Sequence, residues 1–314
     1  MIRYLAGRFL QVIPVLFGVS LIVFALVHLI PGDPAISMLG SRATPELIAR
    51  VHQQFNLDLP LPSQYVNWVA NALRGNFGVS FFYESDVSAI TVARIPLTLL
   101  LIGYSTLLAL VIAVPFATLA AVRRGGVVDQ AIRLLFTASL GMPSFWLAIM
   151  FSLLFGVQLK LFPIAGAGSG GLDTIWHLTL PALTIGLSIA PILVRALRSS
   201  LIEVLQADFV TTGRAAGLRP RTLLVSYILR NSLMPLVTVL SVNVGWLIGG
   251  TVIVEQVFGL PGLGSLLIGS IATRDYAIIQ LVTLLLAFIV IAVNLLTDLA
   301  YVALDPRVSL TGKQ

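Results

Sequence analysis

The chain has 314 residues, of which 58% are hydrophobic and 10% are charged, whereas an ordinary soluble domain has about 25% charged residues. Water is therefore excluded as its main solvent. It contains no cysteine, which excludes disulfide frameworks, thiolate metal sites and cysteine nucleophiles. The net charge of +6 would suit either a nucleic-acid partner or membrane orientation signals, and the distribution of the basic residues decides between them.

Six long apolar runs predict an all-α, polytopic membrane protein with about six transmembrane helices. They lie near residues 9–30, 95–121, 132–158, 178–198, 233–257 and 278–304, each with few or no charges in its middle. A hydrocarbon core about 30 Å thick needs about 20 apolar residues per helix, which each run supplies. The first run is longer than a signal-peptide core, so we expect an uncleaved first helix.

The longest segment between the predicted spans, residues 31–94, should form a small external helical cap. Thr44 can cap a helix with Pro45 at its first position, and apolar residues then recur every four residues as far as Phe55. A second helix is expected from Ser63 to Leu73, and a third begins at 85–86. The chain then divides into the N-terminus with the first helix (1–30), this cap (31–94) and a five-helix core (95–314).

The basic residues indicate orientation. With the amino terminus in the cytoplasm, most of the 19 Lys and Arg residues fall on one side, within 1–8, 123–133, 195–230 and 307–313. The two short loops opposite hold only Lys160 and Arg274. By the positive-inside rule, both termini are cytoplasmic and no nucleic-acid partner is expected.

Two motif searches give negative results. Gly166, Gly168 and Gly171 satisfy G-x-G-x-x-G, but a loop between membrane spans lacks the strand and helix that make this pattern bind a dinucleotide. No G-x-x-x-x-G-K-[ST] loop occurs, so any ATP that drives the protein must bind a partner chain. The three histidines, His28, His52 and His177, are too scattered to predict a metal site.

Residues 199–232 form the most informative segment. Gly213 and Gly217 bracket a short turn of helix that Pro220 ends, and a short helix between two spanning helices, flanked by arginines, can act as a lever. Here the sequence resembles the inner-membrane permeases of ATP-binding-cassette importers, in the dipeptide, oligopeptide, glutathione and nickel branch. The matching frame consists of Asp208, Phe209, Thr211, Thr212, Gly213, Arg214, Ala215, Ala216, Gly217 and Leu218. It departs from that branch in having Phe209 for Tyr, Gly213 for Ala and Ala216 for Lys.

Five further stretches match the same branch along almost the whole chain. They are HLIPGDP at 28–34, GMPSFWL at 141–147, VEQVFGLPGLG at 254–264, RDYAIIQ at 274–280 and NLLTDLAYVALDPRV at 294–308. The resemblance implies a bacterial inner-membrane subunit that pairs with a homologous permease, two ATPase subunits and an external solute-binding protein. The frame would be a cytoplasmic coupling helix between the fourth and fifth spans. This chain would bind no cofactor itself, with ATP and Mg on the ATPases, and would carry no catalytic residue. Peptides, glutathione included, are the expected cargo, and nickel or another small solute is the alternative.

Polar residues within spans are rare enough to be candidates for function. Asn243 and Glu255, on the predicted fifth span, are pore or gate candidates, with interhelical hydrogen bonding as the alternative. Gly245 and Gly249 form a G-x-x-x-G that predicts close packing on a neighbouring helix. A helix of the paired permease is one candidate for this neighbour. A secondary transporter would instead show inverted halves with matched helix breaks, which we do not find.

Overall fold

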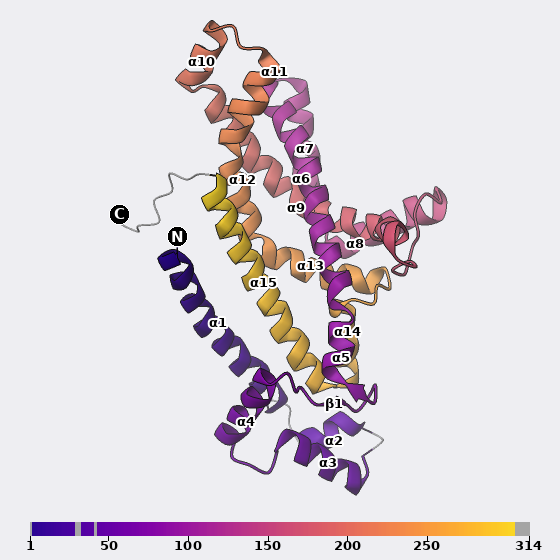
Figure 1. Ribbon diagram of the computed structural model, residues 1–314. Coiled ribbons are helices and arrows are strands. Elements are labelled where there is room, and N and C mark those ends of the chain that lie inside the picture. The colour runs from indigo at the N-terminus through magenta and orange to yellow at the C-terminus, as the bar shows by residue number, and fades with distance from the viewer. Residues whose placement is uncertain (1, 29–32, 41–42, 305–314) are drawn as a thin grey trace. The chain divides into compact units, whose positions relative to one another are not determined.

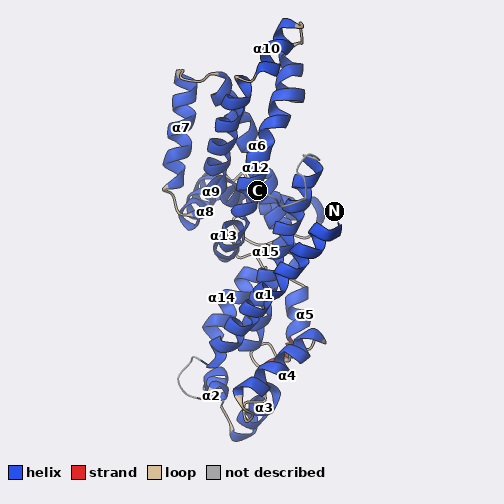
Figure 2. Ribbon diagram, turned by 90° about the vertical axis from the view of Figure 1, so that its left-hand side faces the viewer, coloured by secondary structure: helices blue, strands red, loops and turns tan. Residues whose placement is uncertain are grey.

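The computed structural model describes residues 2–28, 33–40 and 43–304 (Figure 1). The chain forms two compact units: residues 1–99 with 261–292, called unit 1, and residues 100–260 with 293–314, called unit 2. This grouping follows contacts within the chain, whereas the predicted boundaries at 30 and 94 concern the membrane surface and stay a prediction. Figure 2 shows that nearly all of the described chain is helical, which confirms the all-α fold class.

Unit 1 holds the amino-terminal helices and two helices from the C-terminal part of the chain. Its elements are α1 (Ile2–His28), α2 (Pro34–Leu39), α3 (Pro45–Phe55), α4 (Leu61–Leu73), β1 (Val79–Ser80), β2 (Ser85–Asp86), α5 (Val87–Val92), α14 (Leu263–Thr273) and most of α15 (Tyr276–Leu304). The two strands pair antiparallel, with Val79 opposite Asp86. A small core of Ala35, Leu39, Val51 and Tyr276 joins α2, α3 and the start of α15.

The local signals of the predicted cap are confirmed. The Thr44 hydroxyl accepts the Leu47 N–H at 3.3 Å, and α3 ends at Phe55 with Asn56 in the left-handed region. Helix α4 begins two residues earlier than predicted and ends at Leu73 as predicted. The Asp86 carboxylate caps α5 by accepting two backbone N–H groups. Capping residues therefore located α3 and α5 correctly, because the start of each is set by its own N-cap.

Unit 2 contains the longer helices. Its elements are most of α6 (Ile95–Val122), α7 (Val127–Leu140), α8 (Ser144–Phe151), the π-helical η2 (Ser152–Gln158), α9 (Gly171–Leu205), α10 (Asp208–Ala215), α11 (Pro220–Thr222), the π-helical η3 (Leu223–Leu229), α12 (Arg230–Val242) and α13 (Val244–Val257). Helix α9 packs against α7, α8, α12 and α13. A β-carbon on Gly186 of α9 would lie 3.0 Å from the Ser105 carbonyl oxygen of α6. Helices α6 and α9 thus approach closely at this glycine.

Four helical segments in the described chain are long and apolar enough to span a membrane, namely Val87–Val122, Gly171–Leu205, Pro220–Val242 and Tyr276–Thr297. A fifth is formed if α7 and α8 with η2 count as one span, although this pair is bent by 106°. Shorter apolar helices cover Val12–Ala25, Gly245–Val257 and Leu263–Thr273. The expectation of about six transmembrane helices thus meets four or five spanning-length segments and three shorter apolar helices in the described chain.

Two predicted spans need correction. The run 132–158 bends at Gly141–Pro143, because proline has no N–H and disfavours a helical residue before it. The run 233–257 breaks at Asn243, whose side chain donates to the Val239 carbonyl oxygen at 2.7 Å. The continuous helix before this break begins at Pro220, so residues 220–232 belong to a spanning-length helix and not to the predicted loop.

Parts of two matching sequence stretches, residues 29–32 and 305–308, lie outside the described residues, as do Arg307 and Lys313.

Candidate functional site

Helix α10 connects the end of α9 to the π-helical η3, at the end of unit 2 opposite α8 and α13 (Figures 1 and 2). Asp208 lies in its first turn, where the helix dipole favours a carboxylate, and Arg214 lies in its last turn. Val210 and Gly213 form its buried face. A β-carbon on Gly213 would lie 2.9 Å from Cδ1 of Leu223 and 3.3 Å from Cδ1 of Leu218. Glycine at this position lets α10 lie close against η3.

The end of α10 is held by a Schellman motif. The Leu218 N–H donates to the Gly213 carbonyl oxygen at 3.1 Å, and the Gly217 N–H donates to the Arg214 carbonyl oxygen at 3.0 Å. Gly217 has φ of +77°, a conformation that L-residues adopt only with strain. Pro220, at the first position of α11, starts the next helix two residues after Leu218. The loop therefore presents α10 in a fixed, capped geometry.

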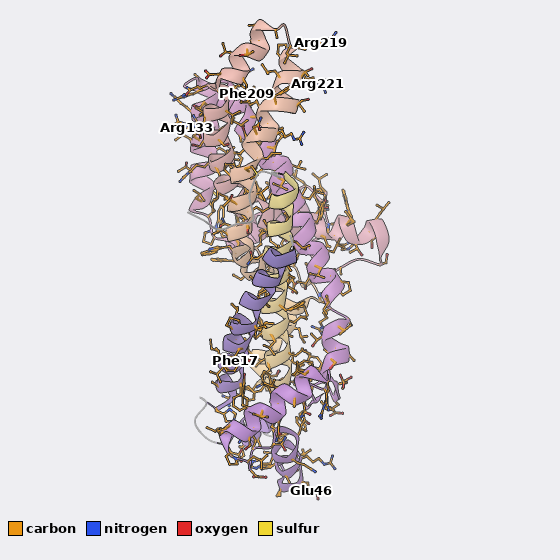
Figure 3. The ribbon with its side chains drawn as sticks, turned by 60° about the vertical axis from the view of Figure 1, so that its left-hand side comes forward. Phe17, Glu46, Arg133, Phe209, Arg219 and Arg221 are labelled. Atoms are coloured by element: carbon orange, nitrogen blue, oxygen red, sulfur yellow. The ribbon has the colours of Figure 1, made fainter. Side chains whose placement is uncertain are left out.

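Nine of the ten residues in the predicted coupling frame are exposed, and Gly213 is the buried one. Phe209 is 41% exposed, although a large aromatic side chain is usually buried. Figure 3 shows that Phe209, Arg219 and Arg221 all lie at this end of the unit. The exposed surface of α10 and the turn after it is thus aromatic, small and basic, a composition suited to a protein partner.

A buried carboxylate that sequence reasoning did not single out holds α7 to α9. Asp129 of α7 is 1% exposed and accepts two hydrogen bonds from Arg198, each 2.7 Å long. It also accepts the Gly125 N–H at 2.9 Å, and the Arg133 Nε lies 3.6 Å from it. The planar guanidinium and carboxylate make a bidentate pair, which fixes orientation as well as distance. The sequence offered one signal for this ion pair, because Asp129 lies four residues before Arg133 on the predicted helix.

A second feature of unit 2 is a hollow of about 990 Å³ where the two helix breaks meet α9. It is lined by Leu140–Ser144 at the first break, Val242 and Asn243 at the second, Ser188, Ile189 and Ile192 of α9, and Gly245, Trp246, Leu247, Gly249, Gly250 and Ile253 of α13. The structure thus brings the pore candidate Asn243 together with Gly245 and Gly249. Glu255 is fully buried and does not line this hollow.

Gly245 and Gly249 are exposed, and a β-carbon on either would meet no described atom within 4 Å. Within the described chain this G-x-x-x-G therefore brings no second helix close, and its packing on another chain stays a prediction. The close helix contact occurs instead at Gly186, which the sequence analysis did not select.

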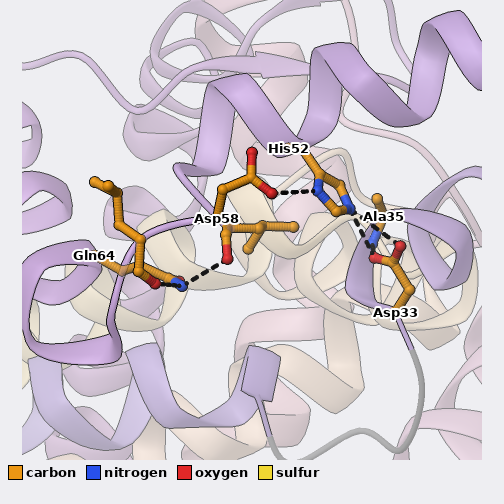
Figure 4. Close-up of polar contacts among 7 residues, drawn as sticks. Asp33, Ala35, His52, Asp58 and Gln64 are labelled. Atoms are coloured by element: carbon orange, nitrogen blue, oxygen red, sulfur yellow. Dashed lines mark hydrogen bonds and ion pairs between the residues drawn. The ribbon is translucent and has the colours of Figure 1, made fainter.

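The histidines of unit 1 serve in local hydrogen bonds. His28 Nε2 lies 2.9 Å from Oε1 of Gln64. His52 lies between two carboxylates, 3.1 Å from Asp58 and 3.0 Å from Asp33 (Figure 4). These hydrogen bonds, to Asp58 first and then to Asp33, raise the pKa of His52. Burial would raise the pKa of Asp33, but the Ala35 N–H and the His52 ring hold it below its usual value. His52 thus connects the start of α2 to the end of α3.

These features define an α-helical membrane subunit with broken spans around a hollow and one short capped helix exposed at an end. Residues 113–310 match the family described as the binding-protein-dependent transport system inner membrane component, and residues 1–102 match the N-terminal part described for such membrane components. The chain belongs to this family of ABC importer permeases, which favours that prediction over a secondary transporter.

Related proteins cover nearly the full chain. It is 35% identical to the probable peptide ABC transporter permease protein y4tP of Sinorhizobium fredii, over 97% of this chain and 98% of that protein. It is 37% identical to the glutathione transport system permease protein GsiC of Pectobacterium atrosepticum, over 98% of this chain and 99% of that protein. A chain of the MetNI methionine ABC transporter in inward-facing conformations matches with a TM-score of 0.56 and 19% identity, over 68% of this chain and 95% of that one. This last likeness supports the fold alone.

Proposed function

We propose that the chain forms half of the translocation pathway of a bacterial ABC importer for peptides, glutathione included, delivered by an external binding protein. Its relatives at 35–37% identity are named as peptide and glutathione permeases over almost their whole length. A homologous permease would supply the other half, and two ATPase subunits would bind ATP and Mg. Both termini would face the cytoplasm, following the positive-inside distribution of basic residues.

Helix α10 is the proposed contact with an ATPase, and one observation carries this assignment. The helix exposes nine of the ten frame residues while its buried face and its Schellman end hold it against η3. A rigid, exposed helix between two long helices can pass a displacement of the ATPase to both of them. The proposed path for the cargo is the hollow at Asn243, because both helix breaks converge there and leave polar groups beside an apolar wall.

The coupling role is tested with Ala215→Arg in the complete importer reconstituted in proteoliposomes. Ala215 is exposed, so the variant should fold and assemble, while the larger side chain disturbs a close-packed contact by about 1–3 kcal/mol. We expect cargo-stimulated ATP hydrolysis and uptake to fall together. Ala131→Arg is the matched control, since Ala131 is an exposed alanine of α7 in the same unit. Undiminished stimulation in Ala215→Arg would refute the assignment of α10.

The cargo is tested by uptake of a labelled dipeptide, an oligopeptide, glutathione and nickel, each with the cognate binding protein. We expect ATP-dependent uptake of a peptide or glutathione. Uptake of nickel alone would reject the peptide assignment and leave the coupling assignment intact.

A further inference from the structure

A groove of about 530 Å³ lies between α7 and α9 and shares only Leu140 with the hollow at Asn243. It is lined by Gln130, Arg133, Leu134, Phe136, Thr137 and Leu140 of α7 and by Pro191, Val194, Arg195 and Arg198 of α9. Three arginines distinguish this groove, and neither the coupling helix nor the proposed cargo path uses their side chains.

The groove carries more positive charge than the chain neutralises. Asp129 is the carboxylate beside it, and this carboxylate is already engaged by both hydrogen bonds of Arg198. Arg133 is 54% exposed on its side chain and reaches Asp129 only at 3.6 Å. Among the described residues, Arg195 has no carboxylate or hydrogen-bond partner, and it is exposed. The groove thus holds three guanidinium groups beside one carboxylate, which leaves an excess of two positive charges.

The groove is also divided into a charged end and an apolar end. Asp129 pairs with Arg198, and Leu140 lines the hollow together with Ser188 and Ile192, so α7 and α9 run antiparallel here. Arg133 therefore falls near the level of Arg195, and Leu140 falls further from the arginines. At about 1.5 Å per residue, Leu140 is about 10 Å further along α7 than Arg133. Leu134, also in the groove, is 71% exposed. A molecule with an anionic head and an apolar tail can therefore place its head at the arginines and its tail along this open, apolar wall.

The two groove arginines of α9 lie at a position along the helix that fits the boundary of the bilayer. The 35 residues of α9 extend about 52 Å, which exceeds a hydrocarbon core of about 30 Å. Arg195 and Arg198 follow directly on its largely buried, apolar stretch from Leu178 to Val194. Arg195 and Arg198 are the first arginines of α9 after this stretch, so a bilayer whose core covers Leu178–Val194 would place them at the depth of the phospholipid headgroups.

We propose that this groove binds an anionic phospholipid, with its phosphate between Arg133 and Arg195 and an acyl chain along the exposed Leu134 and Leu140. Two exposed guanidiniums supply charge-assisted hydrogen bonds to phosphate oxygens, a geometry that arginine favours. A free phosphate ion would use the charged end and leave the apolar end uncovered, whereas a phospholipid covers both.

The test measures phospholipid binding to the full importer complex, purified in a neutral detergent, by native mass spectrometry. Phosphatidylglycerol and phosphatidylcholine with identical acyl chains are titrated separately. Each basic residue near a membrane surface changes binding of anionic lipid about five-fold, so Arg133→Gln with Arg195→Gln should weaken the tightest phosphatidylglycerol site about 25-fold. Arg133→Lys with Arg195→Lys keeps the charge and should retain most of the binding. Neither variant removes the Asp129–Arg198 pair.

Arg123→Gln with Arg124→Gln is the matched control, because both arginines are exposed in the turn before α7 and outside the groove. We expect this control to bind phosphatidylglycerol as the unmodified protein does. Equal weakening in the control, equal binding of phosphatidylcholine, or equally effective displacement by inorganic phosphate would each overturn the proposal.

Discussion

Replacing Asp129 with alanine tests how firmly α7 is held to α9. The carboxylate is 1% exposed, and the Arg198 side chain that would lose its partner is 20% exposed. Removing one member of a buried ion pair destabilises a protein by about 3–5 kcal/mol, because the other charge remains without compensation. Since Arg198 retains some access to water, we expect the lower end, about 3 kcal/mol. At about 2–4 °C per kcal/mol, the unfolding temperature should fall by about 6–12 °C.

The assay is thermal unfolding of the detergent-purified chain, followed for Asp129→Ala, Arg198→Ala and the double variant. Arg198→Ala leaves the carboxylate buried without its bidentate partner, so it should also destabilise. The double variant leaves neither charge unpaired, and the two losses should fall short of additivity by about 2 kcal/mol, the strength of hydrogen bonds between charged groups. Glu203→Ala is the control, since that carboxylate is exposed on α9 itself.

Additive losses would show that the bidentate pair contributes no coupling energy, and an unchanged unfolding temperature in Asp129→Ala would refute its role in holding the two helices.

The remaining predictions concern backbone contacts and pH. Gly186→Ala should lower the unfolding temperature, because its β-carbon would lie 3.0 Å from a backbone oxygen of α6. Gly245→Ala should leave the unfolding temperature unchanged, because its β-carbon would meet no described atom within 4 Å. Equal effects of the two substitutions would contradict this packing. Gly217→Ala should reduce ATPase stimulation because a left-handed alanine costs about 1–2 kcal/mol, and Gly217→Asn should reduce it less, since asparagine tolerates that conformation. The raised pKa of His52 means that its stabilising contribution is fully present below 6.5 and is lost as the pH rises through the raised value. Unfolding temperatures measured against pH should show this loss, and a His52→Gln variant that keeps the same profile would argue against it.

Elements governed by their own residues could be predicted from the sequence. The Thr44 cap and Pro45 fix the start of α3 whatever lies around it, and the structure places both as expected. The turn after α10 follows equally directly, because Gly217 permits the left-handed conformation that ends the helix. The apolar runs at 95–121, 178–198 and 278–304 likewise located three spanning-length helices, since bilayer thickness sets their length.

Features that depend on neighbouring helices could not be predicted. The apolar run through Asn243 has the composition of one span, and only the structure shows that the helix breaks there and that the break faces α9. Asp129 was overlooked because its partner is 69 residues away in the sequence. Glu255 was chosen as a pore candidate for its charge, yet its side chain is fully buried and does not line the hollow.

Helix α9 connects the features on which the proposed function depends. It ends at Leu205, three residues before α10 begins, and it lines the hollow with Ser188, Ile189 and Ile192. From Ser188 to Leu205 the continuous helix covers about 26 Å. The Arg198 pair with Asp129 holds α7 to this stretch, and α7 reaches the same hollow at Leu140. A displacement of α10 would therefore move both walls together, because the helix and its buried ion pair resist local deformation more than the exposed turn does. Transmission within unit 2 alone would link the proposed ATPase contact on α10 to the position of these two walls.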